Sequence, residues 1–229
     1  MKREEVRNRI KEIGILAAIR VDSKEDALFA AEAVYHGGVP AVEIALTLPG
    51  ATEVISQLVQ HNPQLIVGAG SVLNAEAARA CLDAGAMFLT SDGLRQALVE
   101  FAARKEVVVF PGALTPTEVI TAWESGCDFV KVVPCAQIGG ETYIRSLHRM
   151  FPQIPLIAAG GVSQESASRY IFAGAIGLGI GGELLPRGAI RRRQIKRIHE
   201  LARRFVGFVK SAREGRAPQR EGPFIIAPD

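Results

Sequence analysis

Short, continuously apolar segments recur along the chain, and each predicts a buried β-strand. Their mid-points are roughly 20–27 residues apart, a spacing that leaves room for one helix between successive strands. The segments do not alternate apolar and polar residues, so they are typical of strands buried on both faces of a parallel sheet. The eight segments are ILAAIR (15–20), AVEIAL (41–46), LIVGAG (65–70), MFLTS (87–91), VVVFPG (107–112), FVKVVP (129–134), LIAAGG (156–161) and GLGIGG (177–182).

The stretches between these segments carry helical patterns with recognisable ends, as in KEDALFAAEAVYHGG (24–38) and TPTEVITAWESG (115–126). N-cap residues open three of the helices, with Glu118 placed to complete a capping box, and glycines expected in the left-handed conformation close four. The caps are Asn74, Thr115 and Ser163, and the closing glycines are Gly38, Gly85, Gly126 and Gly174. A strand followed by a helix, eight times over, predicts a (β/α)8 TIM barrel of the α/β class.

One domain is expected, because no linker divides the repeats and α/β barrels of about 200–250 residues fold as single units. Residues 1–12 predict an extra N-terminal helix that closes the bottom of the barrel. We place the barrel domain at 1–213, where it ends in a basic C-terminal helix, and we interpret 214–229 as a loosely ordered tail.

The net charge of +3 conceals an uneven distribution along the chain. The segment after Pro186 holds 12 of the 27 basic residues and 4 of the 24 acidic ones, so it carries +8, whereas residues 1–186 carry −5. Apolar residues recur at helical spacing within this basic segment, which favours a packed helix with a solvated basic face. They are Ile195, Ile198, Leu201, Ala202, Phe205 and Val209.

Composition excludes several classes of protein. With 48% hydrophobic and 22% charged residues, the chain is typical of a globular protein rather than a disordered or fibrous one. No apolar run approaches the ~18 residues that span a bilayer, and the charged start at 1–14 does not read as a signal peptide, so we expect a cytoplasmic protein. Three cysteines without ligand spacing argue against a disulfide framework or a zinc site. The four histidines are expected at the surface, and we predict neither a metal nor a cofactor.

Polar residues at the carboxyl ends of barrel strands are the first candidates for catalysis. Four such residues interrupt or follow the apolar segments: Arg20, Glu43, Ser71 and Lys131. Lys131 is the only one of seven lysines within a predicted strand, where desolvation favours the neutral, nucleophilic amine that a Schiff base requires. Glu43 occupies a similar apolar setting and could transfer protons. A purely structural ion pair between Lys131 and Glu43 is the alternative interpretation.

Three predicted strands end in glycine-rich sequence, GAG (68–70), AAGG (158–161) and GIGG (179–182). Backbone N–H groups at such turns bind anions, and the ends of strands 7 and 8 are the usual phosphate site of a TIM barrel. Glycine also permits a tight turn without any ligand, so it is the position of the last two motifs that favours a phosphate or carboxylate site.

Five motifs in this order resemble the class I 2-keto-3-deoxy-6-phosphogluconate (KDPG) aldolases and their 6-phosphogalactonate (KDPGal) relatives. The motifs are VEIALTLPG (42–50), VGAGSVLN (67–74), FPGALTPTE (110–118), FVKVVPCAQIGG (129–140) and AAGGVS (158–163). The resemblance implies reversible cleavage of a 2-keto-3-deoxy-6-phospho sugar acid to pyruvate and glyceraldehyde 3-phosphate. It further implies a homotrimer acting on small 2-keto acids, in some members also on 4-hydroxy-2-oxoglutarate, which yields pyruvate and glyoxylate. Neither a nucleic acid nor a membrane is implied as a partner.

The resemblance also assigns roles to individual residues. It implies that Lys131 forms the imine and that Glu43 shuttles protons. It implies that Ser71 holds the pyruvate carboxylate, and it adds Thr47 and Pro111 to the substrate-binding positions. The implied phosphate-binding glycines are Gly160, Gly161, Gly181 and Gly182.

Several positions depart from the pattern of the gluconate-type enzymes. Thr47 stands where those enzymes carry an arginine, while galactonate-type enzymes carry an arginine at the end of strand 1, where Arg20 is expected to grip an anion instead. Asp92 replaces the proline of an S/T-P-G turn, and Ala159 replaces a threonine linked to stereochemical control. Glu183 lies beside the phosphate glycines and would repel phosphate, so either it points away or the substrate lacks phosphate.

Two other functions stay open at this stage. The chain could be a different phosphate-binding barrel, an isomerase or a phosphosugar synthase, that uses the glycines without an imine. It could also be a noncatalytic barrel whose basic C-terminal segment binds RNA or an acidic partner.

Overall fold

The structure is a computed structural model that describes residues 1–216. The tail predicted for 214–229 therefore lies, beyond residue 216, outside the described residues. The strands are β1 (Ile15–Ile19), β2 (Ala41–Ala45), β3 (Ile66–Gly70), β4 (Phe88–Thr90), β5 (Val108–Phe110), β6 (Gly112–Ala113), β7 (Val130–Val132), β8 (Leu156–Ala159) and β9 (Gly177–Ile180). The helices are α1 (Arg3–Ile13), α2 (Lys24–His36), α3 (Ala51–His61), α4 (Ala75–Asp83), α5 (Gln96–Arg104), α6 (Pro116–Glu124), the 3-10 turn η1 (Ala136–Ile138), α7 (Gly140–Met150), α8 (Gln164–Phe172), α9 (Arg187–Arg191) and α10 (Ile195–Arg213).

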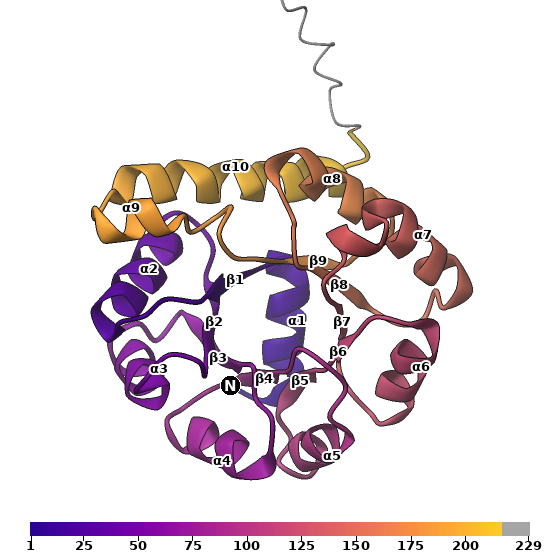
Figure 1. Cartoon of the computed structure of the whole chain (residues 1–229), viewed down its shortest axis with the longest axis horizontal. Coiled ribbons are helices and arrows are strands. Elements are labelled where there is room, and N and C mark those ends of the chain that lie inside the picture. Colours follow the sequence, from indigo (N-terminus) through magenta and orange to yellow (C-terminus); the bar gives the residue numbers. More distant parts are fainter. Residues whose placement is uncertain (217–229) are drawn as a thin grey trace, which may run out of the picture.

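The strands form a closed parallel barrel, which confirms the predicted TIM-barrel architecture. Their hydrogen-bonded order is β5-β4-β3-β2-β1-β9-β8-β7-β6, and Figure 1 shows them as a ring with helices around it. The ring closes because β5 and β6 are two halves of one strand, separated by Pro111. Proline lacks the N–H that a ladder needs, yet the carbonyl of Pro111 accepts from Lys131 N at 3.0 Å. The barrel therefore has eight strands, each within a residue or two of its predicted segment.

The predicted N-terminal helix lies against the end of the barrel opposite the strand C-termini. In Figure 1 α1 crosses the ring of strands. Its apolar residues Val6 and Ile10 pack into the inner core with Phe88, Phe110 and Phe129. The rings of Phe110 and Phe88 are stacked, with centroids 5.3 Å apart. The rings of Phe110 and Phe129 meet edge to face, with centroids 4.8 Å apart. Residues 1–12 thus close the barrel bottom as the sequence predicts.

An ion pair fastens this helix to the barrel. Arg3 donates to both carboxylate oxygens of Asp128, at 3.0 Å from Nε and 2.9 Å from Nη2. The Asp128 side chain, 3% exposed, also accepts from the N–H of Val109 at 3.0 Å. A buried carboxylate with three donors is stable only while those donors are in place.

We expect Asp128→Asn to lower the free energy of unfolding by about 2 kcal/mol, because a neutral amide loses the ion pair and turns N–H groups toward donors. Urea unfolding measures the change. Asp83→Asn, the same substitution at an exposed carboxylate of α4, is the matched control and should shift stability by less than about 0.5 kcal/mol. Equal effects in the two variants would contradict the assignment.

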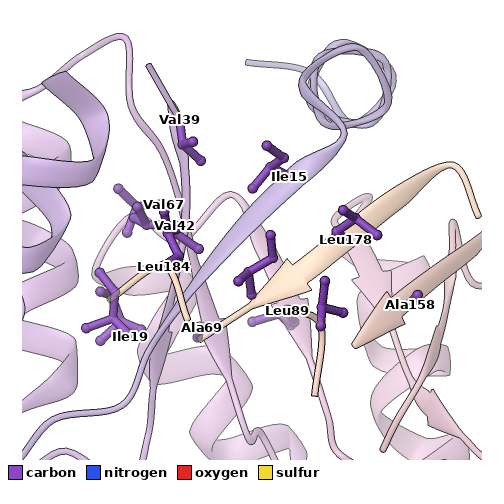
Figure 2. Packing of buried hydrophobic residues seen from close by; sticks show 14 of the residues in the cluster. Ile15, Ile19, Val39, Val42, Val67, Ala69, Leu89, Ala158, Leu178 and Leu184 are labelled. Carbon is purple, nitrogen blue, oxygen red and sulfur yellow. The ribbon is translucent and has the colours of Figure 1, made fainter. Parts of the chain in front are cut away.

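The larger apolar core lies between the barrel and its surrounding helices. Figure 2 shows members of this core from four successive strands of the sheet: Val42 and Val67 are paired across β2 and β3, and Ile15 and Leu178 across β1 and β9. The basic helix α10 contributes Ile198, Ala202, Phe205 and Val209 to this core, and it packs against α8 and α2, which confirms a packed helix there. Ile195 was wrongly assigned to its apolar face, because it lies at the first turn and is 41% exposed.

Most predicted helix ends are confirmed. Asn74, Thr115 and Ser163 each accept a hydrogen bond from the backbone N–H three residues later, and Thr115 forms the full capping box with Glu118. The four closing glycines all have positive φ, from 89° to 107°. Two of the histidines were wrongly expected at the surface: His148 and His199 are half-buried, since α7 and α10 each pack that side of the helix against a neighbour. Within residues 1–216 no helix is both long and apolar enough to cross a membrane.

Candidate active site

The four polar residues selected from the strand sequences meet at one end of the barrel. Arg20 follows β1, Ser71 follows β3, Glu43 is the third residue of β2, and Lys131 is the middle residue of β7. Because the strands are parallel, their carboxyl ends share one rim, and side chains from distant segments converge there. The contacts below join residues that are up to 72 positions apart in sequence.

Lys131 is buried within the barrel, with a side chain only 4% exposed. Its Nζ lies 3.1 Å from Asp92 Oδ1 and 3.3 Å from Thr90 Oγ1, as a donor to both. Glu43 Oε2 is 3.9 Å away, too far for a hydrogen bond but close enough for attraction between charges. Two carboxylates therefore lie beside the amine, so the buried Lys131 side chain has charged partners within 4 Å.

Arg20 connects the remaining polar groups of the rim. Its Nη1 donates to Ser71 Oγ at 3.1 Å, and its Nη2 donates to the two oxygens of Asp92 at 3.1 and 3.3 Å. The same Nη2 is 3.8 Å from Glu43 Oε1. Ser71 in turn donates its hydroxyl proton to Asp92 Oδ2 at 2.7 Å. Two cations and two carboxylates thus share one compact cluster.

Asp92 is ionised in this cluster. Burial by itself would raise the pKa of its carboxyl group, but the charge of Lys131, the hydrogen bond from Ser71 and the charge of Arg20 together lower that pKa to about 2. The side chain is nevertheless 43% exposed, so one side of the carboxylate faces solvent.

Glu43 has its space because Gly70 of β3, two positions beyond the register partner of Glu43, has no side chain. The Glu43 side chain is 3% exposed, and a Cβ on Gly70 would lie 2.2 Å from its Oε1. The carboxylate therefore lies over the backbone of β3, between Arg20 and Lys131.

Ser71 adopts a backbone conformation that residues with a side chain avoid. Its φ is +57°, in the left-handed region, where a Cβ costs roughly 1 kcal/mol. The turn after β3 holds this conformation, and it presents Oγ to Arg20 and Asp92.

Ser71→Gly and Ser71→Ala separate this strain from the role of the hydroxyl. Both variants lack Oγ, but only glycine relieves the backbone, so we expect Ser71→Gly to exceed Ser71→Ala in free energy of unfolding by about 1 kcal/mol. Both should bind a carboxylate ligand more weakly than the wild type. Urea unfolding and ligand titration measure the two effects, and equal stabilities would show that the turn is not strained.

The glycine pairs lie at the ends of two neighbouring strands. β8 pairs with β9, so Gly160 and Gly161 follow the first and Gly181 and Gly182 follow the second on the same rim. Gly160 and Gly161 have φ of +80° and +83°, and a Cβ at either would press on Pro134 or Ala136 at 2.7 or 2.5 Å. The turn after β8 therefore requires glycine for its own geometry, whatever it binds, whereas a Cβ on Gly182 would have no atom within 4 Å, so glycine is not required sterically there.

The other predicted positions are less central. Thr47 is exposed in the turn after β2, and Pro111 is buried between β5 and β6. Ala159 is buried at the end of β8, while Glu183 is exposed after β9. Within residues 1–216, no cluster of three or more His, Cys, Asp or Glu side chains could hold a metal ion.

Sequence reasoning did not select two residues that contact Lys131. Thr90 ends β4 and is fully buried, and Asp92 lies two residues beyond it. Asp92 was noted only as a departure from a family motif. Thr90 lies within the MFLTS segment (87–91) and Asp92 directly follows it, so a search for polar residues at every strand end, rather than at the most unusual ones, would have found them.

Comparisons with known proteins agree on one family. The family model for KDPG and KHG aldolase matches residues 6–201. The chain is 30% identical to the 2-dehydro-3-deoxy-phosphogluconate aldolase of Pseudomonas aeruginosa, over 84% of this chain and 88% of the relative. It is also 30% identical to the 2-dehydro-3-deoxy-6-phosphogalactonate aldolase of Escherichia coli, over 87% and 95%.

A solved structure supports the same relationship. It is that of the KDPG aldolase from Legionella pneumophila with pyruvate captured at low pH as a covalent carbinolamine intermediate. It superposes with a TM-score of 0.78 at 27% identity, covering 83% of this chain and 92% of that one.

Proposed function

Since the chain belongs to the KDPG and KHG aldolase family, we propose that it cleaves a 2-keto-3-deoxy-6-phospho sugar acid reversibly to pyruvate and glyceraldehyde 3-phosphate. The observation that carries this proposal is Lys131, a lysine buried inside the barrel with two carboxylates beside its amine. Such an amine, held away from bulk water near groups that can accept its proton, suits the formation of an imine.

The first step is attack of Lys131 Nζ on the C2 ketone of the substrate. The attack forms a carbinolamine, and loss of water gives a protonated imine that withdraws electrons from the adjacent carbon. The ammonium must first lose a proton, and the carboxylates of Asp92 and Glu43, at 3.1 and 3.9 Å, are within reach to accept it directly or through water.

Cleavage follows when a base removes the proton of the C4 hydroxyl. We assign this role to Glu43, because its carboxylate is buried close to Nζ. As the C3–C4 bond breaks, its electron pair moves into the imine and forms an enamine, and glyceraldehyde 3-phosphate leaves. Glu43 then returns the proton to C3, and hydrolysis of the imine releases pyruvate. One carboxylate can act as base and then as acid in successive steps.

The two anionic ends of the substrate need separate holders. Residues 13–186 carry 10 basic and 17 acidic residues, so the barrel as a whole repels an anion and local groups must attract it. We assign Arg20 and Ser71 to the C1 carboxylate, with Thr47 and Pro111 lining the site. Gly160, Gly161, Gly181 and Gly182 would hold the phosphate through their N–H groups, on adjacent strand ends. The exposed Glu183 carboxylate can turn to solvent there.

The test of substrate identity is a comparison of cleavage rates. The 6-phosphogluconate-derived acid, its galactonate epimer and 4-hydroxy-2-oxoglutarate should be supplied separately and pyruvate release followed. We expect cleavage of at least one phosphorylated epimer; turnover of none of the three would contradict the proposal. Arg20 at the end of β1 matches the arginine of the galactonate-type enzymes, so the galactonate epimer is the first substrate to test.

The alternative functions explain less. An isomerase or synthase would account for the glycine turns, but its reaction would not require an imine at the buried Lys131 amine. The basic helix α10 packs its apolar face on α8 and α2, as a structural element does, and needs no RNA to account for it. We further propose that the protein is a cytoplasmic homotrimer, whose mass by sedimentation should be about three times the 24.6 kDa chain.

A further inference from the structure

One carboxylate of this chain already holds the donors assigned to the substrate. Asp92 accepts from Arg20 Nη2 with both oxygens, from Ser71 Oγ at 2.7 Å and from Lys131 Nζ at 3.1 Å. These are the guanidinium and hydroxyl that would bind the C1 carboxylate, together with the amine that would bond to C2. A 2-keto acid carries its carboxylate on the carbon next to the ketone. Asp92 therefore contacts both the donors assigned to that carboxylate and the amine assigned to the ketone carbon.

Two carboxylates cannot use these donors at the same time. The hydroxyl of Ser71 has one proton to donate, and a second anion placed beside Asp92 would meet like-charge repulsion in a partly buried site. Either the substrate carboxylate binds elsewhere or Asp92 gives up its contacts.

The structure allows Asp92 to move its side chain while its backbone stays. A Cβ on Gly112 would lie 2.5 Å from the carbonyl carbon of Asp92, so β6 presses directly on this part of the main chain. The adjacent Ser91 is buried and donates its hydroxyl to Gly93 O at 2.8 Å, which fixes the turn. The Asp92 side chain, by contrast, is 43% exposed, so it borders water into which the carboxylate can turn.

We propose that Asp92 is a displaceable internal anion, which keeps Arg20, Ser71 and Lys131 aligned until the carboxylate of a 2-keto acid replaces it. The inference rests on the proposed function in one respect, the assignment of Arg20 and Ser71 to the C1 carboxylate. Asp92 is then a positioning residue that also selects for ligands with a carboxylate. A ligand without one would leave the Arg20 guanidinium without an anionic partner once Asp92 has moved. Because the contacts of Asp92 must be broken before a 2-keto acid binds, Asp92 lowers the affinity of the site for every such ligand.

The test is calorimetric binding of oxamate, an isostere of pyruvate whose amide carbonyl does not form an imine. The proteins compared are the wild type, Asp92→Asn and Asp22→Asn. Asp22 offers the same chemical change two residues from Arg20, but its side chain is 79% exposed and lies 3.9 Å from its nearest partner, Arg191. We expect Asp92→Asn to bind oxamate about tenfold more tightly, as expected when one charge-assisted contact need no longer be broken, and Asp22→Asn to bind as the wild type does.

Unchanged or weaker binding by Asp92→Asn would overturn the proposal, as would equal tightening by Asp22→Asn, which would indicate only a change in overall charge. Asp92→Ala removes the hydrogen-bond acceptor altogether and should also bind more tightly than the wild type. If both Asp92 variants lost their thermal unfolding transition, Asp92 would be a structural residue and the proposal would be wrong. Oxamate binding does not require catalysis, so a failure of imine trapping with pyruvate would count against the proposed function alone.

Discussion

Replacement of Lys131 by alanine is expected to reduce retro-aldol cleavage by on the order of 10^6-fold, the scale seen when an enzyme loses its covalent nucleophile. Without the amine there is no imine to accept the electron pair of the C3–C4 bond, and no other lysine of the described barrel is buried in a strand. The measurement is pyruvate release from the preferred phosphorylated acid.

Borohydride reduction in the presence of pyruvate supplies a direct readout of the same residue. The wild type should gain the mass of a reduced pyruvate adduct on the peptide that contains Lys131, and Lys131→Ala should gain none. Lys105→Ala, which removes an exposed lysine after α5, is the matched control and should label as the wild type does. A labelled Lys131→Ala protein, or an unlabelled wild type, would refute the imine.

Substitution of Glu43 by glutamine is expected to slow turnover by about 10^2- to 10^4-fold, the usual contribution of a general acid or base. The amide has nearly the same shape, so it fits in the space left by Gly70, but it cannot take up the proton of the C4 hydroxyl. Imine formation with pyruvate should continue, because the Lys131 amine and the donors assigned to the keto-acid carboxylate, Arg20 and Ser71, are unchanged in this variant.

The two readouts must therefore diverge in Glu43→Gln, with adduct formation largely kept and cleavage largely lost. Glu53→Gln, at an exposed carboxylate on α3, controls for the general effect of one charge. Parallel loss of trapping and cleavage would instead assign Glu43 to the alignment of Lys131, and wild-type cleavage would remove it from the mechanism.

Much of the fold follows from local patterns. Strands buried on both faces are apolar at every position, so the eight segments are visible without any partner, and the caps at Asn74, Thr115 and Ser163 depend only on residues three positions away. Lys131 was visible for the same reason, since a charged residue inside an apolar strand is rare and conspicuous.

The arrangement of the site did not follow from such patterns, because its contacts join segments that only the closed barrel brings together. Lys131 and Asp92 are 39 positions apart, and Arg20 and Asp92 are 72 apart. The strand register decides which side chains meet, and a single glycine, Gly70, leaves the space in which the Glu43 carboxylate lies. By itself the sequence determined the barrel and singled out Lys131, the lysine to which we assign the imine. Only the tertiary structure decided that Asp92, from the turn after β4, accompanies that lysine in addition to Glu43, because hydrogen bonds of about 3 Å depend on the exact closure of the ring.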